Sequence, residues 1–372
     1  MKPPRLDVAP KFGGGAVLRA LGVFWGAVVL LGGGLGVALQ VLGPPVVAMP
    51  HGAAPVVVAP VVVAAAPVVV APVVVAPPPV VVVPAVVDGA VAVTVGRPGA
   101  PVAAADPALL EGSPSYQGRH LPRPGAGQRL PMRVYAAGQD PGETRPRIAI
   151  LLADFGQSDQ DSDEAIKGLP PAVSFAVSPY ARRAERLIGS ARARGHELFA
   201  VVPLEPFNYP INDPGPNALL TGGAPGQNAL NLEWALSRFN GYVGVTAVLG
   251  RMHGERYANA PELYAVMLEE IARRGLMYVD PRPGGAMPRT AGMPPYRAVD
   301  LVVDGIQVRA EVEARLAQLE KIARERGMAL GLADSPAPMT IDRISAWATS
   351  LPVRGMVLVP VSAVVAPVSK GN

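Results

Sequence analysis

One short stretch limits the possible folds of this chain more than any other. Residues 148–153 read Ile-Ala-Ile-Leu-Leu-Ala, and they are followed by Asp154, Phe155 and Gly156. An uncharged run without alternation is typical of a parallel strand that is covered on both faces. In folds built from such strands, ligands gather at the carboxyl ends, where Asp154 would lie. The alternative is that Asp154 only caps the helix that follows.

From residue 147 onward, strand-like and helix-like stretches alternate. Repeated β–α units of this length predict an α/β fold with a parallel sheet that is closed or nearly closed into a barrel. Strands are expected over 172–177, 198–202, 242–249, 276–279, 298–303, 328–332 and 356–359, and helices over 181–194, 228–239, 261–274, 307–326 and 339–350.

The first 146 residues differ in composition from the rest. The chain contains 43 Pro and 41 Gly, and the excess lies in this part. An Ala-Pro-Val-Val-Val unit repeats imperfectly from Ala54 to Pro84, and its prolines exclude both a helix and a sheet ladder. Residues 88–145 stay rich in Gly, Pro, Ala and Arg without a sustained period. We therefore expect a disordered spacer over 43–146 and one folded domain over 147–368.

The segment 20–42 has the features of a transmembrane helix. It carries no charge, and at a helical rise its length is about 34 Å, enough to cross a bilayer core. Basic residues dominate 1–19, which places that segment in the cytoplasm and the folded domain in the periplasm. A cleaved signal peptide is the alternative, but the apolar run is long and the Gly-Pro-Pro after it is a poor cleavage site. We expect a single-pass protein of the inner membrane.

Charge and residue counts exclude several classes of function. The first 146 residues hold 10 Lys and Arg against 6 Asp and Glu, whereas the remainder holds 23 of each and is formally neutral. A neutral domain gives no electrostatic reason to expect nucleic-acid binding. The chain has no Cys, so a thiol nucleophile and a disulfide framework are excluded, and its 4 His limit metal and triad chemistry.

The order of motifs in the second part of the chain carries a family resemblance. The most specific are Pro-Gly-Pro-Asn-Ala-Leu-Leu-Thr-Gly at 214–222 and Tyr-Val-Gly-Val at 242–245. Ala-Asp-Phe-Gly at 153–156, Gly-His-Glu at 195–197, Pro-Leu-Glu-Pro at 203–206 and Leu-Val-Pro-Val-Ser at 358–362 accompany them. With these motifs the chain resembles the divergent polysaccharide deacetylase family of bacterial envelope proteins. The resemblance implies a distorted (β/α) barrel of the polysaccharide deacetylase type.

The departures from the family pattern affect its chemistry. The family has paired aspartates where this chain has Ala153 and Asp154. It has histidines where this chain has Val201, Val248 and Leu332. Metal-dependent deacetylation requires carboxylate and imidazole ligands, and valine and leucine supply no lone pairs. We therefore expect no metal site and no cofactor, and in this sense a pseudoenzyme.

Polar residues remain at the expected strand ends. Asp154, Glu205, Asp280 and Arg282 are the candidates for a weak or vestigial catalytic site. The simpler interpretation is that Asp280 and Arg282 form a structural ion pair and that Glu205 orients a loop. His253 would rebuild a site only if it met Asp154 and Asp334. His196, after a helix-ending glycine, is expected to cap or pack.

Sugar binding can persist after catalysis is lost. Phe155, Phe207, Tyr209 and Tyr242 lie near the expected strand ends, where their rings would stack on pyranose faces. Aromatic residues at such positions are more often part of the core.

Three functions stay open at this point. The first is a membrane-anchored pseudoenzyme that binds an envelope glycan or a periplasmic protein partner. The second is an active hydrolase of amide bonds in an N-acetylated polysaccharide, with an unusual site that contains Asp154, Asp280 and His253. The third is a tethered envelope assembly protein without a glycan role.

Overall fold

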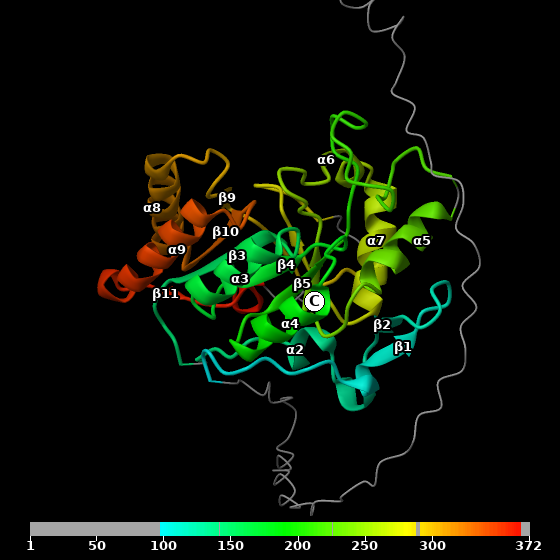
Figure 1. Cartoon of the computed structure of the whole chain (residues 1–372), viewed down its shortest axis with the longest axis horizontal. Helices are drawn as coiled ribbons and strands as arrows, with labels where there is room; N and C mark the ends of the chain where they lie inside the picture. The colour runs from blue at the N-terminus through cyan, green and yellow to red at the C-terminus, as the bar shows by residue number, and fades with distance from the viewer. Residues whose placement is uncertain (1–96, 141, 225, 288–290, 366–372) are drawn as a thin grey trace, which may run out of the picture. The chain divides into compact units, whose positions relative to one another are not determined.

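The computed structural model describes residues 97–140, 142–224, 226–287 and 291–365 (Figure 1). The predicted cytoplasmic segment 1–19, the transmembrane helix 20–42 and the spacer up to residue 96 lie outside these residues, as do residues 366–368. Among the described residues, no helix combines the length and the hydropathy that crossing a membrane requires.

A parallel sheet forms the centre of the fold. Its strands are hydrogen-bonded in the order β8-β7-β6-β5-β4-β3-β10-β9, with β11 paired to the beginning of β3. Since β8 and β9 end this path without pairing to each other, the sheet is an open half-barrel, in line with the expected deacetylase-type fold. The strands are β3 (Arg147–Phe155), β4 (Ser174–Val177), β5 (Leu198–Val201), β6 (Gly244–Thr246), β7 (Met277–Asp280), β8 (Tyr296–Ala298), β9 (Leu301–Val302), β10 (Met328–Ala333) and β11 (Val357–Leu358).

Helices connect the strands and cover the outer face of the sheet (Figure 1). Local sequence sets their ends: Ser158 caps the first of them by accepting the amide of Asp161, and Gly327 ends the longest in the left-handed region at φ +79°. The helices are α3 (Asp159–Gly168), α4 (Ala184–Ala193), α5 (Gln227–Leu236), α6 (Glu255–Ala258), α7 (Pro261–Arg273), α8 (Arg309–Arg326) and α9 (Pro338–Ser350), with 3-10 turns η3 (Pro352–Arg354) and η4 (Val361–Ala363) near the end.

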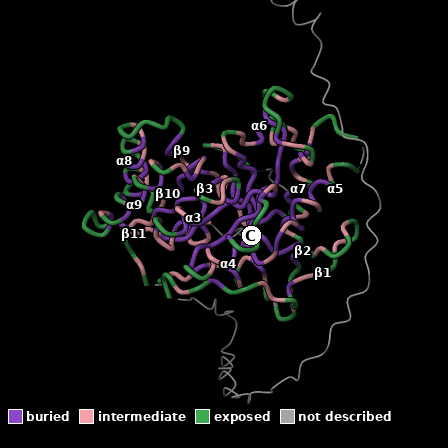
Figure 2. Tube along the Cα trace, viewed as in Figure 1, coloured by how far each residue is buried: buried purple, intermediate pink, exposed green. Residues whose placement is uncertain are grey.

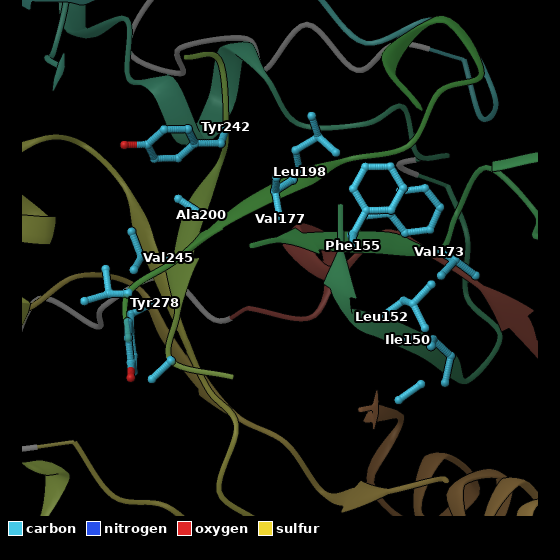
Figure 3. Packing of buried hydrophobic residues seen from close by; sticks show 14 of the residues in the cluster. Ile150, Leu152, Phe155, Val173, Val177, Leu198, Ala200, Tyr242, Val245 and Tyr278 are labelled. Atoms are coloured by element: carbon cyan, nitrogen blue, oxygen red, sulfur yellow. The ribbon is translucent and has the colours of Figure 1, made fainter. Parts of the chain in front are cut away.

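The strands separate two hydrophobic layers because side chains alternate between the faces of a sheet. On β3, the residues Ile148, Ile150 and Leu152 belong to the outer layer beneath the helices. Ala149, Leu151 and Ala153 belong to a second cluster inside the half-barrel. Figure 3 shows part of the outer layer, and the buried segments of Figure 2 follow the sheet. The uncharged run at 148–153 is therefore a strand covered on both faces, as predicted.

The structure corrects the predicted spacer boundary. Residues 97–146 are not a linker throughout, because Leu109 and Tyr135 are buried in the interior cluster and Leu121 in the outer layer. The Arg274 guanidinium on the α7 side donates to the carboxylate of Glu111 and to the carbonyl of Pro122. The elements of this segment are η1 (Pro107–Leu109), β1 (Leu110–Gly112), β2 (His120–Pro122), η2 (Ala126–Gln128) and α2 (Pro131–Val134).

Candidate functional site

The predicted polar residues follow the carboxyl ends of the parallel strands. Two open cavities lie at this end, which we call the mouth. The Asp154 cavity, of about 380 Å³, is lined by Asp154, Gln157, Tyr180, Asp213, Pro214, Gly215, Pro216, Leu249, Gly250 and Met252. The Arg282 cavity, of about 470 Å³, is lined by Phe207, His253, Glu255, Ala258, Asn259, Arg282, Pro283, Gly284, Gly285 and Ala286.

Asp154 has an unusual backbone. Its φ of +54° is the only positive φ of a non-glycine residue among the described residues, and Asp154 lies within an irregularity in the pairing of β3 with β4. Aspartate tolerates this region better than most residues do. Its Oδ1 accepts the amide of Gly250 at 2.8 Å. Burial raises the pKa of Asp154 to about 6, the Gly250 amide acts in the opposite direction, and the negative charge of Asp334 adds to the rise.

This raised pKa predicts how the Asp154→Asn variant behaves. A carboxyl whose pKa is about 6 in the folded protein and 3.8 ordinarily binds more protons in the folded state, so stability falls as pH rises from 4 to 6. Asparagine removes this loss while its amide oxygen still accepts the Gly250 amide. At pH 7 we expect the free energy of unfolding of the variant to be about 1–2 kcal/mol higher than that of the wild type. This range allows for the partial exposure of Asp154 to solvent.

Urea unfolding at pH 4, 5, 6 and 7 measures this effect. Asp304 has its pKa raised to about 6 by burial and by the charge of Asp334, so part of the pH dependence remains in the variant. Asp342→Asn, at an exposed position of α9, is the matched control. Its free energy of unfolding is expected to change with pH as that of the wild type does. If the free energy of unfolding of Asp154→Asn changes with pH in the same way as that of the wild type, the Asp154 carboxyl does not cause the loss of stability.

Asp280 and Arg282 form the structural pair that the simpler interpretation predicts. Asp280 is completely buried. Its Oδ1 accepts the amide and Nε of Arg282 at 3.0 and 2.9 Å. Its Oδ2 accepts Arg282 Nη2 at 2.6 Å and the hydroxyls of Tyr264 and Tyr296 at 3.2 and 2.6 Å. Both carboxylate oxygens are fully used, so Asp280 holds the segment that presents Arg282 to its cavity.

Glu205 fixes a loop, in agreement with its simpler interpretation. Its Oε2 accepts the amide and hydroxyl of Thr221 at 2.5 and 2.6 Å, and its Oε1 accepts Arg256 Nη1 at 3.0 Å. The carboxylate therefore joins the two ends of the segment between residues 205 and 221 and connects them to α6. That loop carries Phe207 and Tyr209.

Of the two histidines considered as candidates, only His253 lies at the mouth, whereas His196 precedes β5 at the opposite end of the strands. His196 is fully buried, stacks on Phe175 and has Nδ1 at 2.9 Å from the carbonyl of Val173, which makes it a packing residue. His253 Nε2 lies 3.0 Å from Asp334 Oδ1. The amide of Asp334 in turn donates to buried Asp304 at 2.7 Å. The sequence gives no direct sign of the contact between His253 and Asp334, because only the folding of β6 and β10 into one sheet brings the two residues together.

The structure divides the predicted aromatic residues into two groups. Phe155 and Tyr242 are buried in the outer layer, and Figure 3 shows both among core side chains. Their predicted sugar contacts are therefore wrong, because no ring face is free. Phe207 is 59% exposed and lines the Arg282 cavity, and Tyr209 is partly buried on the same loop.

Sequence reasoning missed the Asp154 cavity as a unit. Tyr180 donates its hydroxyl to the carbonyl of Pro214, and Gly215 turns beneath that hydroxyl at φ +99°. A Cβ at Gly215 would lie 2.4 Å from the Tyr180 oxygen, so only glycine fits. The Pro-Gly-Pro at the start of the 214–222 motif indicates a tight turn, but the sequence does not show that this turn contacts Tyr180.

The residues at the metal positions of the family do not fit a metal ion. Val201, Val248 and Leu332 are at most 1% exposed, and with Ala153 they belong to the single apolar cluster inside the half-barrel. Aliphatic side chains offer no donor atom. Across the described parts of the chain, no group of three or more His, Asp or Glu side chains is arranged to hold a metal.

Comparison with known proteins agrees with the motifs. The family model "Divergent polysaccharide deacetylase" matches residues 150–365. No curated protein matches the chain. A crystal structure of an uncharacterized protein from Agrobacterium tumefaciens C58 is similar at 31% identity and a TM-score of 0.59, over 66% of this chain and 100% of that one.

Two more distant solved structures have TM-scores below 0.5. A putative cellobiose-phosphate cleavage protein from Enterococcus faecalis V583 has 11% identity and a TM-score of 0.43, over 60% of this chain and 100% of that one. The catalytic domain of a peptidoglycan N-acetylglucosamine deacetylase from Eubacterium rectale ATCC 33656 has 12% identity and a TM-score of 0.37, over 64% of this chain and 98% of that one. The family match spans more than half of the sequence and agrees with the parallel half-barrel: this chain belongs to the divergent polysaccharide deacetylase family.

Proposed function

We propose that this protein binds an envelope glycan at the mouth of its half-barrel and does not carry out the metal-dependent deacetylation of related enzymes. The observation that carries the proposal is the apolar cluster that replaces the metal ligands. Val201, Val248 and Leu332 pack together with Ala153 rather than leaving a polar pocket. A bound cation there would lose its hydration without gaining ligands.

The Arg282 cavity supports a sugar ligand. Phe207 offers an exposed ring, and aromatic faces stack on the apolar faces of pyranoses. Asn259, His253 and Glu255 add donors and acceptors for hydroxyl groups. Arg282 uses Nε and Nη2 on Asp280, whereas Nη1 has no partner among the described residues and is available to a ligand.

Phe207→Ala tests the glycan site. Loss of the ring is expected to weaken binding to purified peptidoglycan fragments or other envelope glycans by about 5- to 30-fold, since a stacked aromatic contributes about 1–2 kcal/mol. Affinity measurements on the full-length protein give the result. Val266→Ala, an exposed apolar position of α7 outside the mouth, serves as control and is expected to bind normally.

A protein that binds none of these glycans refutes the proposal. It would favour the assembly protein without a glycan role, or a periplasmic protein as the partner.

A second candidate function rests on the contact between His253 and Asp334. An imidazole oriented by a carboxylate is the arrangement of a general base, and His253 lines the Arg282 cavity. On this alternative the protein hydrolyses N-acetyl groups without a metal. The test is release of acetate from N-acetylglucosamine oligomers in the presence of a chelator. Release by the wild type that is lost in His253→Gln would support this alternative and contradict our proposal.

The proposed location is the periplasmic side of the inner membrane, with 20–42 as the anchor and the following segment up to about residue 96 as a spacer. The run of uncharged residues and the basic residues before it support this orientation. Alkaline phosphatase fused after residue 372 is expected to be active, because that enzyme requires an oxidising compartment.

A further inference from the structure

A third cavity lies away from the mouth, on the outer face of the half-barrel. Helices α5 and α7 form its two walls, and the loop between β1 and β2 lines one end (Figure 1). Its volume is about 510 Å³, larger than that of either cavity of the mouth. We call it the α5–α7 groove.

The groove is mainly apolar. Leu121, Leu219, Leu232 and Met267 line it, and all four belong to the outer hydrophobic layer. Val266 also lines the groove and is 66% exposed. A partner that covers Val266 and fills the hollow beside it therefore buries one continuous apolar surface.

A buried cation faces the groove with an open donor. Arg274 is 5% exposed and lines the groove. Its Nε donates to Glu270 at 2.7 Å, and its Nη1 donates to Glu111 at 3.1 Å and to the carbonyl of Pro122 at 3.0 Å. Nη2 has no hydrogen-bond partner within the described residues, and it is not one of their enclosed unpartnered atoms. It is therefore accessible from the groove and can donate to a ligand.

The charges along the groove are mainly acidic. Three glutamates and two arginines line it. Glu270 pairs with both arginines, and Glu233 accepts three hydrogen bonds from the loop between β1 and β2. Glu269 is exposed on α7 and has no ion-pair or hydrogen-bond partner in the described parts of the chain. A basic group of a partner is favoured at Glu269, whereas an anionic partner is disfavoured by all three carboxylates.

We propose that the α5–α7 groove binds an amphipathic helix of a partner protein, with a Lys or Arg in the last turn of that helix. A groove between two helices accepts a third through apolar side chains at i, i+3 or i+4 and i+7. The last four carbonyls of a helix have no partner within it, so one of them can accept Nη2 of Arg274. Glu269 lies between one and two turns before Arg274, where it meets a basic residue of the same last turn.

This interaction is independent of glycan binding, because the groove and the two cavities of the mouth share no lining residue.

Photocrosslinking of the full-length protein in intact cells identifies what occupies the groove. Benzoylphenylalanine replaces Ala229, an exposed residue that lines the groove, or Val353, an exposed residue of η3 that serves as control. We expect a crosslink from position 229, and not from position 353, to one segment of another protein. That segment is expected to have apolar residues at i, i+3 or i+4 and i+7 and a Lys or Arg in its last turn.

A synthetic peptide of the crosslinked segment then tests the charge pairing on the purified full-length protein. Glu269→Arg is expected to weaken binding of the peptide by about 5- to 10-fold, and Val266→Asp by at least about 10-fold. A peptide whose basic residue is replaced by Glu should regain affinity for Glu269→Arg. Glu185→Arg, the same change of charge at an exposed position of α4, is the matched control and should bind as the wild type does.

The groove and the mouth are tested separately, because Phe207→Ala is expected to bind the peptide normally and glycans weakly. A crosslink from position 229 to a second copy of this chain, to a lipid or to a glycan overturns the inference. So does the absence of a crosslink specific to that position, or a peptide whose affinity does not respond to Glu269→Arg.

Discussion

Glu197→Ala is expected to lower the free energy of unfolding by about 3–5 kcal/mol, one of the two largest effects predicted for this chain. Glu197 is completely buried beside β5. Its carboxylate accepts the amide of Ala137 at 3.2 Å, the hydroxyl of Ser174 at 3.1 Å and the amide of Ser362 at 3.0 Å. Alanine leaves three donors without this partner, two of them buried and that of Ser362 partly buried, and each buried orphan donor costs about 1–3 kcal/mol.

The effect is large because these contacts join distant parts of the chain. Ala137 belongs to the segment before β3, and Ser362 to η4 near the end of the described chain. Ser174 also accepts the amide of Val361, which extends the same network. Loss of Glu197 would therefore loosen both segments from the sheet.

Chemical unfolding, with near-UV circular dichroism as a check of native packing, measures this loss. Glu197→Gln keeps an acceptor and is expected to lose less than Glu197→Ala. Glu185→Ala, at an exposed position of α4, is the matched control and should stay within about 1 kcal/mol of the wild type. A Glu197→Ala protein as stable as the control would show that the network does not hold the fold.

Restoring histidine at Val201 and Val248 is expected to destabilise the protein rather than to restore a metal site. Both valines are buried in the interior cluster, which consists of hydrophobic side chains. An imidazole placed there buries polar ring nitrogens among hydrophobic side chains, and burying a polar group without a hydrogen bond costs about 1–3 kcal/mol. For the double variant we expect a loss of about 2–6 kcal/mol.

Thermal unfolding with and without Zn²⁺ distinguishes two explanations of the replaced residues. If the interior has been repacked around valine and leucine, Zn²⁺ leaves the melting temperature of the double variant unchanged. A melting temperature that rises by more than about 5 °C on addition of one equivalent of Zn²⁺ would show that the ligand geometry persists and that only the donor atoms were lost. Val201→Ile and Val248→Ile, which add volume without polarity, serve as controls.

Much of the fold was predictable from the sequence because its signals are local. The uncharged run at 148–153 identified a doubly covered strand, and glycines such as Gly327 marked helix ends. Short edge strands carried weaker signals: β8, at 296–298, has only partly buried residues and was not predicted. The segment 97–146 was misjudged because its Gly and Pro content resembles that of a linker, whereas a few buried residues such as Leu109 and Tyr135 attach it to the domain.

The candidate site was predictable in its composition, but most of its contacts were not. The pair of Asp280 with Arg282 is only two residues apart, whereas the sequence gives no sign that Asp154 contacts Gly250, 96 residues away, or that Glu205 contacts Thr221. Burial was the second limit. Phe155 follows β3 into the outer layer, whereas Phe207 stays exposed on a loop, and their sequence contexts do not tell them apart.

The central claim is that an apolar interior has replaced the metal centre of this family. Its most direct test is the metal content of the purified full-length protein, by mass spectrometry and by titration with Zn²⁺, Co²⁺ and Mn²⁺ at neutral pH. The account predicts far less than one equivalent of each metal and no saturable binding at micromolar concentration. One tightly held equivalent of any of these ions, lost on mutation of Asp154 or His253, would contradict it.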